Sequence, residues 1–108
     1  MPVTVRLTDD AVRDLEEIFD YVSRQNEPGR AEHVLDRIEG AFQALSAFPQ
    51  RGSYPRELLD LGVREYREVF FKPYRIIYRV MEDGVYVMVI ADGRRDMRAL
   101  LQRRLLRV

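Results

Sequence analysis

Apolar residues recur at helical spacing in two stretches of the first half of the chain. In the first stretch, residues 9–22, they lie three or four positions apart, and Thr8 in front of it is a typical helix N-cap. The second stretch follows Pro28, a residue suited to the first turn of a helix, and ends near Pro49. The apolar positions are Ala11, Leu15, Ile18 and Val22, then Ala31, Val34, Leu35, Ile38, Phe42 and Leu45. Because only a short break at residues 26–29 separates the two stretches, they predict an antiparallel helical hairpin.

Four other stretches have the composition of β-strands. The third of them alternates apolar residues with arginines, and the fourth is an almost unbroken run of β-branched and aromatic residues. The expected strands are Val3–Leu7, Arg64–Phe71, Tyr74–Met81 and Val85–Ala91. Asp83-Gly84, between the last two, supplies the positive-φ residues that a tight hairpin needs. The second half of the chain therefore predicts a sheet built mainly from hairpins.

The order of the predicted elements is β-α-α-β-β-β-(α). One helical turn is expected at Glu57–Leu61, and a terminal helix is expected over residues 96–107, where leucines alternate with arginines. This order predicts a single α+β domain, residues 1–108, with the helical hairpin on one face of a small antiparallel sheet. Both sheet faces are expected to carry apolar residues, so the second face requires either a partner or the terminal helix as cover.

Composition narrows the class of protein. The chain has 108 residues and no cysteine, which excludes disulfides, thiolate chemistry and a cysteine-ligated zinc site. The sequence after Met1 has no long apolar run, so neither a signal peptide nor a membrane span is expected. We therefore expect a cytoplasmic protein that uses no metal and no other cofactor.

Charge is distributed unevenly, although the formal net charge is zero. Residues 1–60 carry 7 arginines and 12 acidic residues, a balance of −5, whereas residues 61–108 carry 10 arginines, Lys72 and 6 acidic residues, a balance of +5. The predicted hairpin places Arg75 and Arg79 on one strand and leads into the Arg94-Arg95 pair. Guanidinium groups suit bidentate contacts with phosphate or carboxylate, so an anionic partner is expected at the basic half.

Several of these charged and aromatic residues also have a purely structural interpretation. Arg75 and Arg79 would pair with acidic residues across the sheet, and Asp96 would cap the terminal helix and pair with a neighbouring arginine. The acidic candidates for the two sheet arginines are Glu65, Glu68 and Glu82. His33 is expected at the surface of the second helix, and the strand tyrosines Tyr66, Tyr74, Tyr78 and Tyr86 are expected to pack within the sheet.

Six motifs, in this order, resemble the RelE/ParE superfamily of toxins from bacterial type II toxin–antitoxin systems. They are residues 14–22, residues 36–42, Phe48-Pro49 followed by Gly52, residues 61–64, residues 74–80 and residues 90–96. The resemblance implies a small toxin that is neutralised by a proteic antitoxin, with growth arrest and plasmid stabilisation as its effects. It also implies that operator DNA is contacted only through the antitoxin.

Two branches of the superfamily differ in their chemistry. RelE-like members are ribosome-dependent mRNA endonucleases, and ParE-like members poison DNA gyrase. Arg75 and Arg95 match arginines of the RelE-like pattern, but Tyr66 and Glu68 stand where that pattern has lysines, and Leu101 lies near its catalytic tyrosine or histidine.

The residue types present favour the ParE-like branch. Cleavage of RNA through its 2′-hydroxyl needs a base and an acid, and arginine stays protonated. The chain has no His, Tyr, Lys or Cys after Met88, so no catalytic residue is favoured. If the chain is a nuclease, the candidates are Arg75 and Arg95 with Glu65 or Glu68 as the base.

The resemblance leads to two predicted binding sets. Arg94, Arg95 and Arg98 are expected to bind the target, DNA gyrase. The expected antitoxin-binding residues are Arg75, Arg79, Met88, Met97 and Leu101. Two alternatives stay open: a ribosome-dependent endonuclease, and an inactive member that serves as a scaffold or operon co-repressor.

Overall fold

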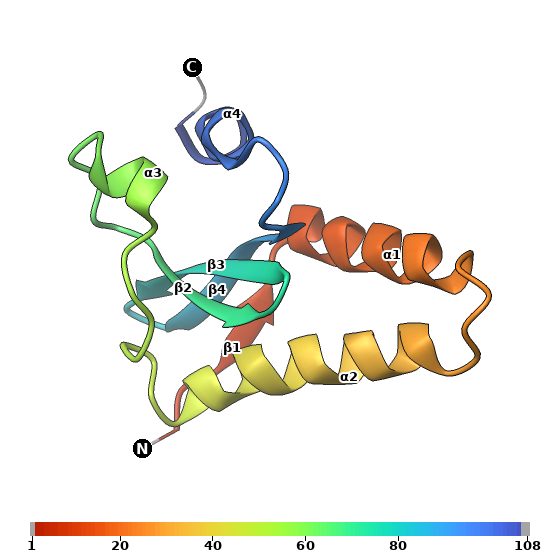
Figure 1. The fold of residues 1–108 in the computed structure, drawn as a ribbon. Coiled ribbons are helices and arrows are strands. Elements are labelled where there is room, and N and C mark those ends of the chain that lie inside the picture. The colour runs from red at the N-terminus through yellow and green to blue at the C-terminus, as the bar shows by residue number, and fades with distance from the viewer. Residues whose placement is uncertain (1, 107–108) are drawn as a thin grey trace.

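The computed structural model of the chain describes residues 2–106 (Figure 1). Its helices and strands are β1 (Val5–Leu7), α1 (Asp9–Ser23), α2 (Arg30–Gln43), α3 (Arg56–Leu59), β2 (Arg67–Phe71), β3 (Tyr74–Met81), β4 (Gly84–Asp92) and α4 (Met97–Leu101). A 3₁₀ turn, Ala44–Ser46, extends α2, and a π-helical segment, Gln102–Leu106, extends α4. The α+β fold and the element order are confirmed, and the last residue of the expected terminal helix, residue 107, lies outside the described residues.

The helical hairpin forms as its pattern predicts (Figure 1). Thr8 is the N-cap of α1, and its Oγ1 accepts a hydrogen bond from the Ala11 backbone N–H at 3.1 Å. Pro28, by contrast, does not occupy the first turn of α2, because Gly29 takes the cap position at φ 80° and the helix begins at Arg30. A left-handed residue turns the chain there, and glycine adopts that conformation at little cost.

The four strands form one sheet in the order β1-β4-β3-β2. The β2–β3 and β3–β4 pairs are antiparallel, whereas β1 joins β4 in parallel, from Val5 opposite Val85 to Leu7 opposite Val87. The antiparallel prediction thus holds for the three strands of the second half, and β1 is the exception. β3 has the predicted bounds, and β2 begins at Arg67 instead of Arg64.

An irregular register between β3 and β4 lets β4 serve both sheet faces. Ile77 pairs with Val89 and the next residue, Tyr78, pairs with Val87, so Met88 is an extra residue in β4. Val87 consequently faces the helical hairpin, and Val89 faces the opposite side. Because both faces are covered, β4 is apolar along nearly its whole length instead of alternating.

The sheet separates two apolar cores. The hairpin core lies between the sheet and α1–α2, and the terminal core lies between the sheet and α3–α4 (Figure 1). The hairpin core includes Ala11, Val22, Val34, Ile38, Phe42, Leu45, Tyr74, Ile76, Tyr78, Val85, Val87 and Ile90. The terminal core consists of Leu58, Tyr66, Ile77, Val89, Ala91, Met97, Leu100 and Leu101. Of the two predicted covers for the second face, the structure uses the terminal helix.

A close backbone approach fixes the long loop between α2 and β2. Gly52 donates its N–H to the Tyr78 hydroxyl at 3.0 Å, and Ser53 exchanges backbone hydrogen bonds with Glu68. A Cβ at Gly52 would lie 2.6 Å from the Glu68 carbonyl oxygen, so the loop accepts only glycine there. Tyr66, Tyr74 and Tyr78 are buried as predicted, and Tyr86 is half-buried with its hydroxyl donating to Asp83.

Candidate functional site

The turn after β4 presents the first two arginines of the predicted target set. Asp92 ends the strand, and its Oδ1 accepts hydrogen bonds from both the Arg94 backbone N–H and Nε, each at 2.9 Å. These contacts with Arg94 lower the pKa of the Asp92 carboxyl. The Arg94 side chain is nevertheless 79% exposed, and Arg95 is exposed as well. Both guanidinium groups therefore stand at the surface on a turn whose backbone is fixed.

The third member of the set lies on the short helix that follows. Asp96 caps α4 as predicted, with its Oδ1 accepting a hydrogen bond from the Ala99 N–H at 3.1 Å. Arg98 contacts Asp60 at 3.3 Å, and both side chains are 53% exposed, so solvent weakens this pair. Arg94, Arg95 and Arg98 thus share one short segment that joins β4 to α4.

Arg95 also lines a hollow between α1 and the ends of β3 and β4, which we call the α1 hollow. Its volume is about 580 Å³. Its charged lining consists of Asp14, Glu17, Asp20, Arg24, Asp92 and Arg95. Burial, together with the charge of Asp92, raises the pKa of Tyr74, which forms part of the wall. The mixed charges favour a partner that carries both signs over a simple anion.

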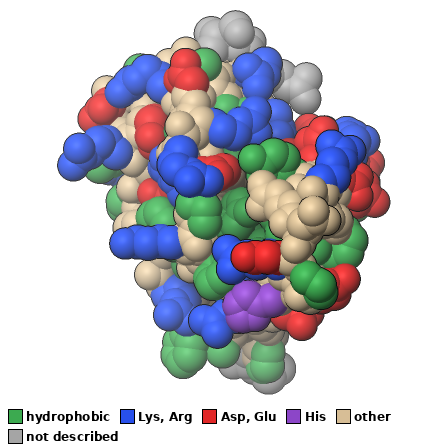
Figure 2. Space-filling model, turned by 45° about the vertical axis from the view of Figure 1, so that its right-hand side comes forward, with side chains coloured by type: hydrophobic (Ala, Val, Ile, Leu, Met, Phe, Trp, Pro, Cys, Tyr) green, Lys and Arg blue, Asp and Glu red, His purple; other side chains and the backbone are tan. Residues whose placement is uncertain are grey.

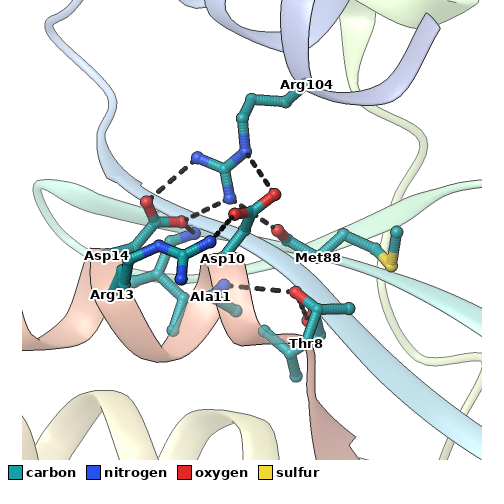
Figure 3. Close-up of polar contacts among 9 residues, drawn as sticks. Thr8, Asp10, Ala11, Arg13, Asp14, Met88 and Arg104 are labelled. Atoms are coloured by element: carbon teal, nitrogen blue, oxygen red, sulfur yellow. Dashed lines mark hydrogen bonds and ion pairs between the residues drawn. The ribbon is translucent and has the colours of Figure 1, made fainter.

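One side of this hollow contains an ion pair that periodicity did not predict (Figure 3). Arg104, from the π-helical segment, donates to both carboxylate oxygens of Asp14 on α1 at 3.0 and 2.9 Å, and also to the Met88 carbonyl oxygen at 2.9 Å. Asp14 Oδ2 accepts the Ile90 N–H as well, at 2.9 Å. With side chains 10% and 17% exposed, the two residues connect α1, β4 and the terminal segment. The signal in the sequence was a lone acid on the apolar face of the first predicted helix.

On the opposite sheet face, Arg75 lies between two carboxylates. Its Nε donates to Glu68 at 2.8 Å, and its two terminal nitrogens donate to the two Glu57 oxygens, each at 2.8 Å. Hydrogen bonding to Arg75 lowers the pKa of Glu57 to about 2, whereas burial raises the pKa of Glu68. The predicted pairing of Arg75 with Glu68 is confirmed, and Glu57 was missed because α3 brings it from a distant loop.

The four residues named for a possible nuclease do not form one group. Arg75 and Glu68 pair with each other, Arg95 lines the α1 hollow, and Glu65 lines a different hollow beside β2. Leu101, near the position of a catalytic residue in the RelE-like pattern, is fully buried in the terminal core. His33 is exposed on α2, with its ring 6.2 Å from that of Phe71.

The predicted antitoxin-binding residues do not form one exposed surface in the free chain. Met97 and Leu101 are 3% and 0% exposed, and the Arg75 side chain is 13% exposed within its ion pairs. Met88 packs partly buried against the terminal core, and Arg79 lies with its guanidinium 5.9 Å from the centre of the Tyr66 ring. The predicted pairing of Arg79 with an acid of the sheet is therefore replaced by a cation–π contact.

The acidic and basic halves of the sequence pair with each other in the fold. Four ion pairs join the two halves: Arg6–Asp83, Arg75–Glu57, Arg98–Asp60 and Arg104–Asp14. Acidic and basic side chains accordingly alternate over the face shown in Figure 2, where the single histidine is also at the surface. Part of the anionic partner expected for the basic half is therefore the first half of the same chain.

Residues 2–106 were also searched for a metal centre and for a membrane-spanning helix. Within this range no three His, Asp or Glu residues are placed to hold a metal ion together. None of the helices described there is long and apolar enough to cross a membrane.

Comparisons with known proteins agree with these features of the fold. The family model described as "ParE toxin of type II toxin-antitoxin system, parDE" matches residues 5–97. Toxin ParE3 of Caulobacter vibrioides is 37% identical over 90 residues, which is 82% of this chain and 84% of the relative. The terminal segment that carries Arg104 follows the range matched by the family model.

Solved structures show the same fold. A chain of the chromosomal ParDE toxin–antitoxin system from P. aeruginosa superposes with a TM-score of 0.70 at 20% identity, covering 83% of this chain and 95% of that one. A chain of the toxin–antitoxin complex RelBE2 from Mycobacterium tuberculosis superposes with a TM-score of 0.59 at 27% identity, covering 85% and 92%.

Proposed function

Because the chain belongs to the ParE toxin family of type II toxin–antitoxin systems, we propose that it acts by binding DNA gyrase. In this proposal the toxin stabilises the cleaved-DNA state of gyrase, blocks replication and arrests growth. It does so through protein–protein contact, without a reaction of its own.

The main support is the separation of the nuclease candidates. The Arg75 guanidinium is held by Glu57 and Glu68, and a cation whose charge is already balanced contributes little to stabilising a phosphorane. Leu101 offers no proton-transferring group where the RelE-like pattern has one. The remaining candidates, Arg95 and Glu65, line two different hollows. Binding therefore accounts for this arrangement better than cleavage.

The proposed target surface is the segment of Arg94, Arg95 and Arg98. Its backbone is fixed by Asp92 on one side and by the Asp96 cap on the other, so little conformational freedom is lost when a partner binds. Exposed arginines on a rigid turn are typical of the residues that contribute most to protein–protein binding.

The first experiment follows macromolecular synthesis after induction in bacteria that lack the antitoxin. We expect incorporation of labelled thymidine to fall within minutes while incorporation of labelled methionine continues, and purified gyrase to accumulate cleaved DNA when the toxin is added. Early loss of methionine incorporation would instead identify a ribosome-dependent endonuclease. If neither incorporation fell, the chain would be an inactive scaffold or co-repressor.

Replacing both turn arginines tests the surface directly. Arg94→Ala with Arg95→Ala is expected to abolish toxicity and gyrase-dependent cleavage while the thermal melting profile stays the same, because both side chains are exposed. Arg13→Ala with Arg37→Ala is the matched control, since it removes two exposed arginines from the helical hairpin. Full toxicity of the turn variant would rule out this target surface.

We also propose that a cognate antitoxin neutralises the chain by displacing the terminal segment. The support is that Met97 and Leu101, two predicted contact residues, are buried beneath that segment in the free chain. An amphipathic antitoxin helix would replace α4 over the terminal core. Amide hydrogen exchange of the complex tests this: α4 amides should exchange faster with antitoxin bound, and equal protection would exclude displacement.

A further inference from the structure

A second hollow lies beside β2, on the sheet face of Arg75 but at the other end of the strand, and we call it the arginine cleft. Its volume is about 250 Å³. Three guanidinium-bearing side chains line it: Arg64 from the loop before β2, Arg67 from β2 and Arg79 from β3. Tyr54, Glu65 and Val80 complete the part of the lining that matters here. Three chain segments therefore bring positive charge to one small concave site.

The charges in this cleft are not balanced inside the protein. Among residues 2–106, ion pairs within 4.0 Å hold Arg75, Arg94, Arg98 and Arg104, but no such pair holds Arg64, Arg67 or Arg79. Glu65 is the acidic residue of the lining, so the cleft carries a net charge of +2 from three arginines and one glutamate. Like charges brought together repel, and a bound anion would relieve that repulsion.

Neutral groups hold two of the three guanidiniums in place. Arg67 donates to the Gly52 carbonyl oxygen at 2.8 Å and to the Tyr54 hydroxyl at 3.2 Å. Its guanidinium carbon also lies 4.6 Å from the centre of the Tyr54 ring. Arg79 lies over the Tyr66 ring, which is itself buried. The positions are thus fixed before any ligand arrives, and the positive charge remains available.

We propose that the arginine cleft binds the phosphodiester backbone of a nucleic-acid strand. The guanidinium fork matches the geometry of phosphate oxygens, and three forks in one cleft suit adjacent backbone groups. Tyr54 and Val80 are each 37% exposed at the cleft, so a nucleobase extends the Arg67–Tyr54 stack. The contacts are to backbone and ring faces, so the binding is independent of base sequence.

This inference does not depend on the identity of the toxin's target. The contact serves a toxin that meets DNA on gyrase and equally one that meets RNA on the ribosome. Arg64, Arg67 and Arg79 are not among the residues of the proposed gyrase-binding surface. The test below contains no gyrase, so its failure and the failure of the proposed function are separate results.

The test measures fluorescence anisotropy of a labelled single-stranded oligothymidine about twelve nucleotides long, titrated with the full chain between about 50 and 200 mM salt. Replacing Arg64 and Arg79 by glutamine is expected to weaken binding at least tenfold and to lower the salt slope by about two, one for each lost phosphate contact. Arg13→Gln with Arg37→Gln, which removes the same charge from the helical hairpin, should change affinity less than twofold.

The opposite change gives a gain of affinity that a structural role would not produce. Glu65→Gln removes the negative charge from the cleft lining, so we expect tighter binding and a steeper salt dependence. If Arg79→Gln impairs folding, Arg64→Gln and Glu65→Gln still test the cleft, because both residues are exposed. Three results would overturn the proposal: no binding at low salt, wild-type affinity of the cleft variants, or equal displacement by polyglutamate, which would indicate an acidic peptide site.

Discussion

The two apolar cores on either side of the sheet are held in different ways. The hairpin core has thirteen buried apolar residues and packs two helices of 15 and 14 residues against β3 and β4. The terminal core has eight, and its covering helices α3 and α4 have 4 and 5 residues. Around the smaller core lie the ion pairs of Arg75 with Glu57 and Glu68, of Arg98 with Asp60, and of Arg104 with Asp14. Where helices are too short to bury much surface, directional charged contacts attach them.

The difference gives the two sides different sensitivities. Apolar burial depends little on pH, whereas a carboxylate paired with arginine contributes only while it is ionised. Short helices with few buried side chains also belong to the parts of a protein that open locally at low cost. The terminal side is therefore the side that a partner or a change of conditions opens first.

The largest effect is expected from breaking the Asp14–Arg104 pair. Asp14→Asn keeps an acceptor for the Ile90 N–H but leaves the Arg104 guanidinium without a carboxylate in a site where it is 17% exposed. Removing one partner of a buried pair costs about 3–5 kcal/mol, and we expect a loss of that order in urea unfolding at neutral pH.

A double-mutant cycle separates charge from packing in this pair. Arg104→Met keeps the apolar stem of the side chain, and the double variant should be more stable than Asp14→Asn alone, because no unpaired charge remains buried. Additive losses would mean that the two side chains do not interact in solution.

A smaller effect is expected from a cavity in each core. Ile38→Ala and Leu101→Ala each empty a fully buried site, which costs roughly 2–5 kcal/mol. We expect Ile38→Ala to accelerate amide exchange throughout the chain and Leu101→Ala to accelerate it mainly in α3 and α4. Uniform acceleration by both variants would show that the two cores open as one unit.

The smallest effect concerns pH. Bonding to Arg75 lowers the pKa of Glu57 from 4.5 to about 2, so the unfolded chain takes up this proton first and stability falls as pH drops through that range. Glu68, whose pKa is raised, acts in the opposite direction above 4.5, because protonation there favours the folded state. Thermal melting between pH 5 and about 2 should therefore show a shallower loss for Glu57→Gln than for wild type. The exposed control Glu39→Gln should follow wild type, and a wild-type slope in Glu57→Gln would contradict the assigned pairing.

The sequence predicted the features that depend on neighbouring residues. Thr8 and Asp96 cap their helices, and β3 runs from Tyr74 to Met81, because capping and strand patterning are local. The parallel pairing of β1 with β4 joins residues about 80 positions apart and leaves no local signal. The Met88 bulge was missed for a related reason, since a run that is apolar on both faces carries no period-two pattern.

The candidate site was less accessible to sequence reasoning than the fold. Arg75 was identified as a notable residue, but its Glu57 partner comes from a loop whose path a sequence pattern cannot fix. Arg64 and Arg67 belong to the arginine cleft only because the loop at Gly52 returns Tyr54 to the edge of β2. Charges counted by halves of the sequence suggested a basic surface, and the fold instead uses many of them in pairs between the halves.

The parallel pairing of β1 with β4 has a consequence for synthesis of the chain on the ribosome. The N-terminal strand is made first, but its neighbour in the sheet is made about 80 residues later, and the Arg104 that pairs with Asp14 comes later still. The helical hairpin emerges without the surface that buries its apolar face, and β4 and the terminal segment arrive only as translation ends. Folding is thus completed after release of the nascent chain, and a message truncated before β4 yields an unfolded product that proteases remove.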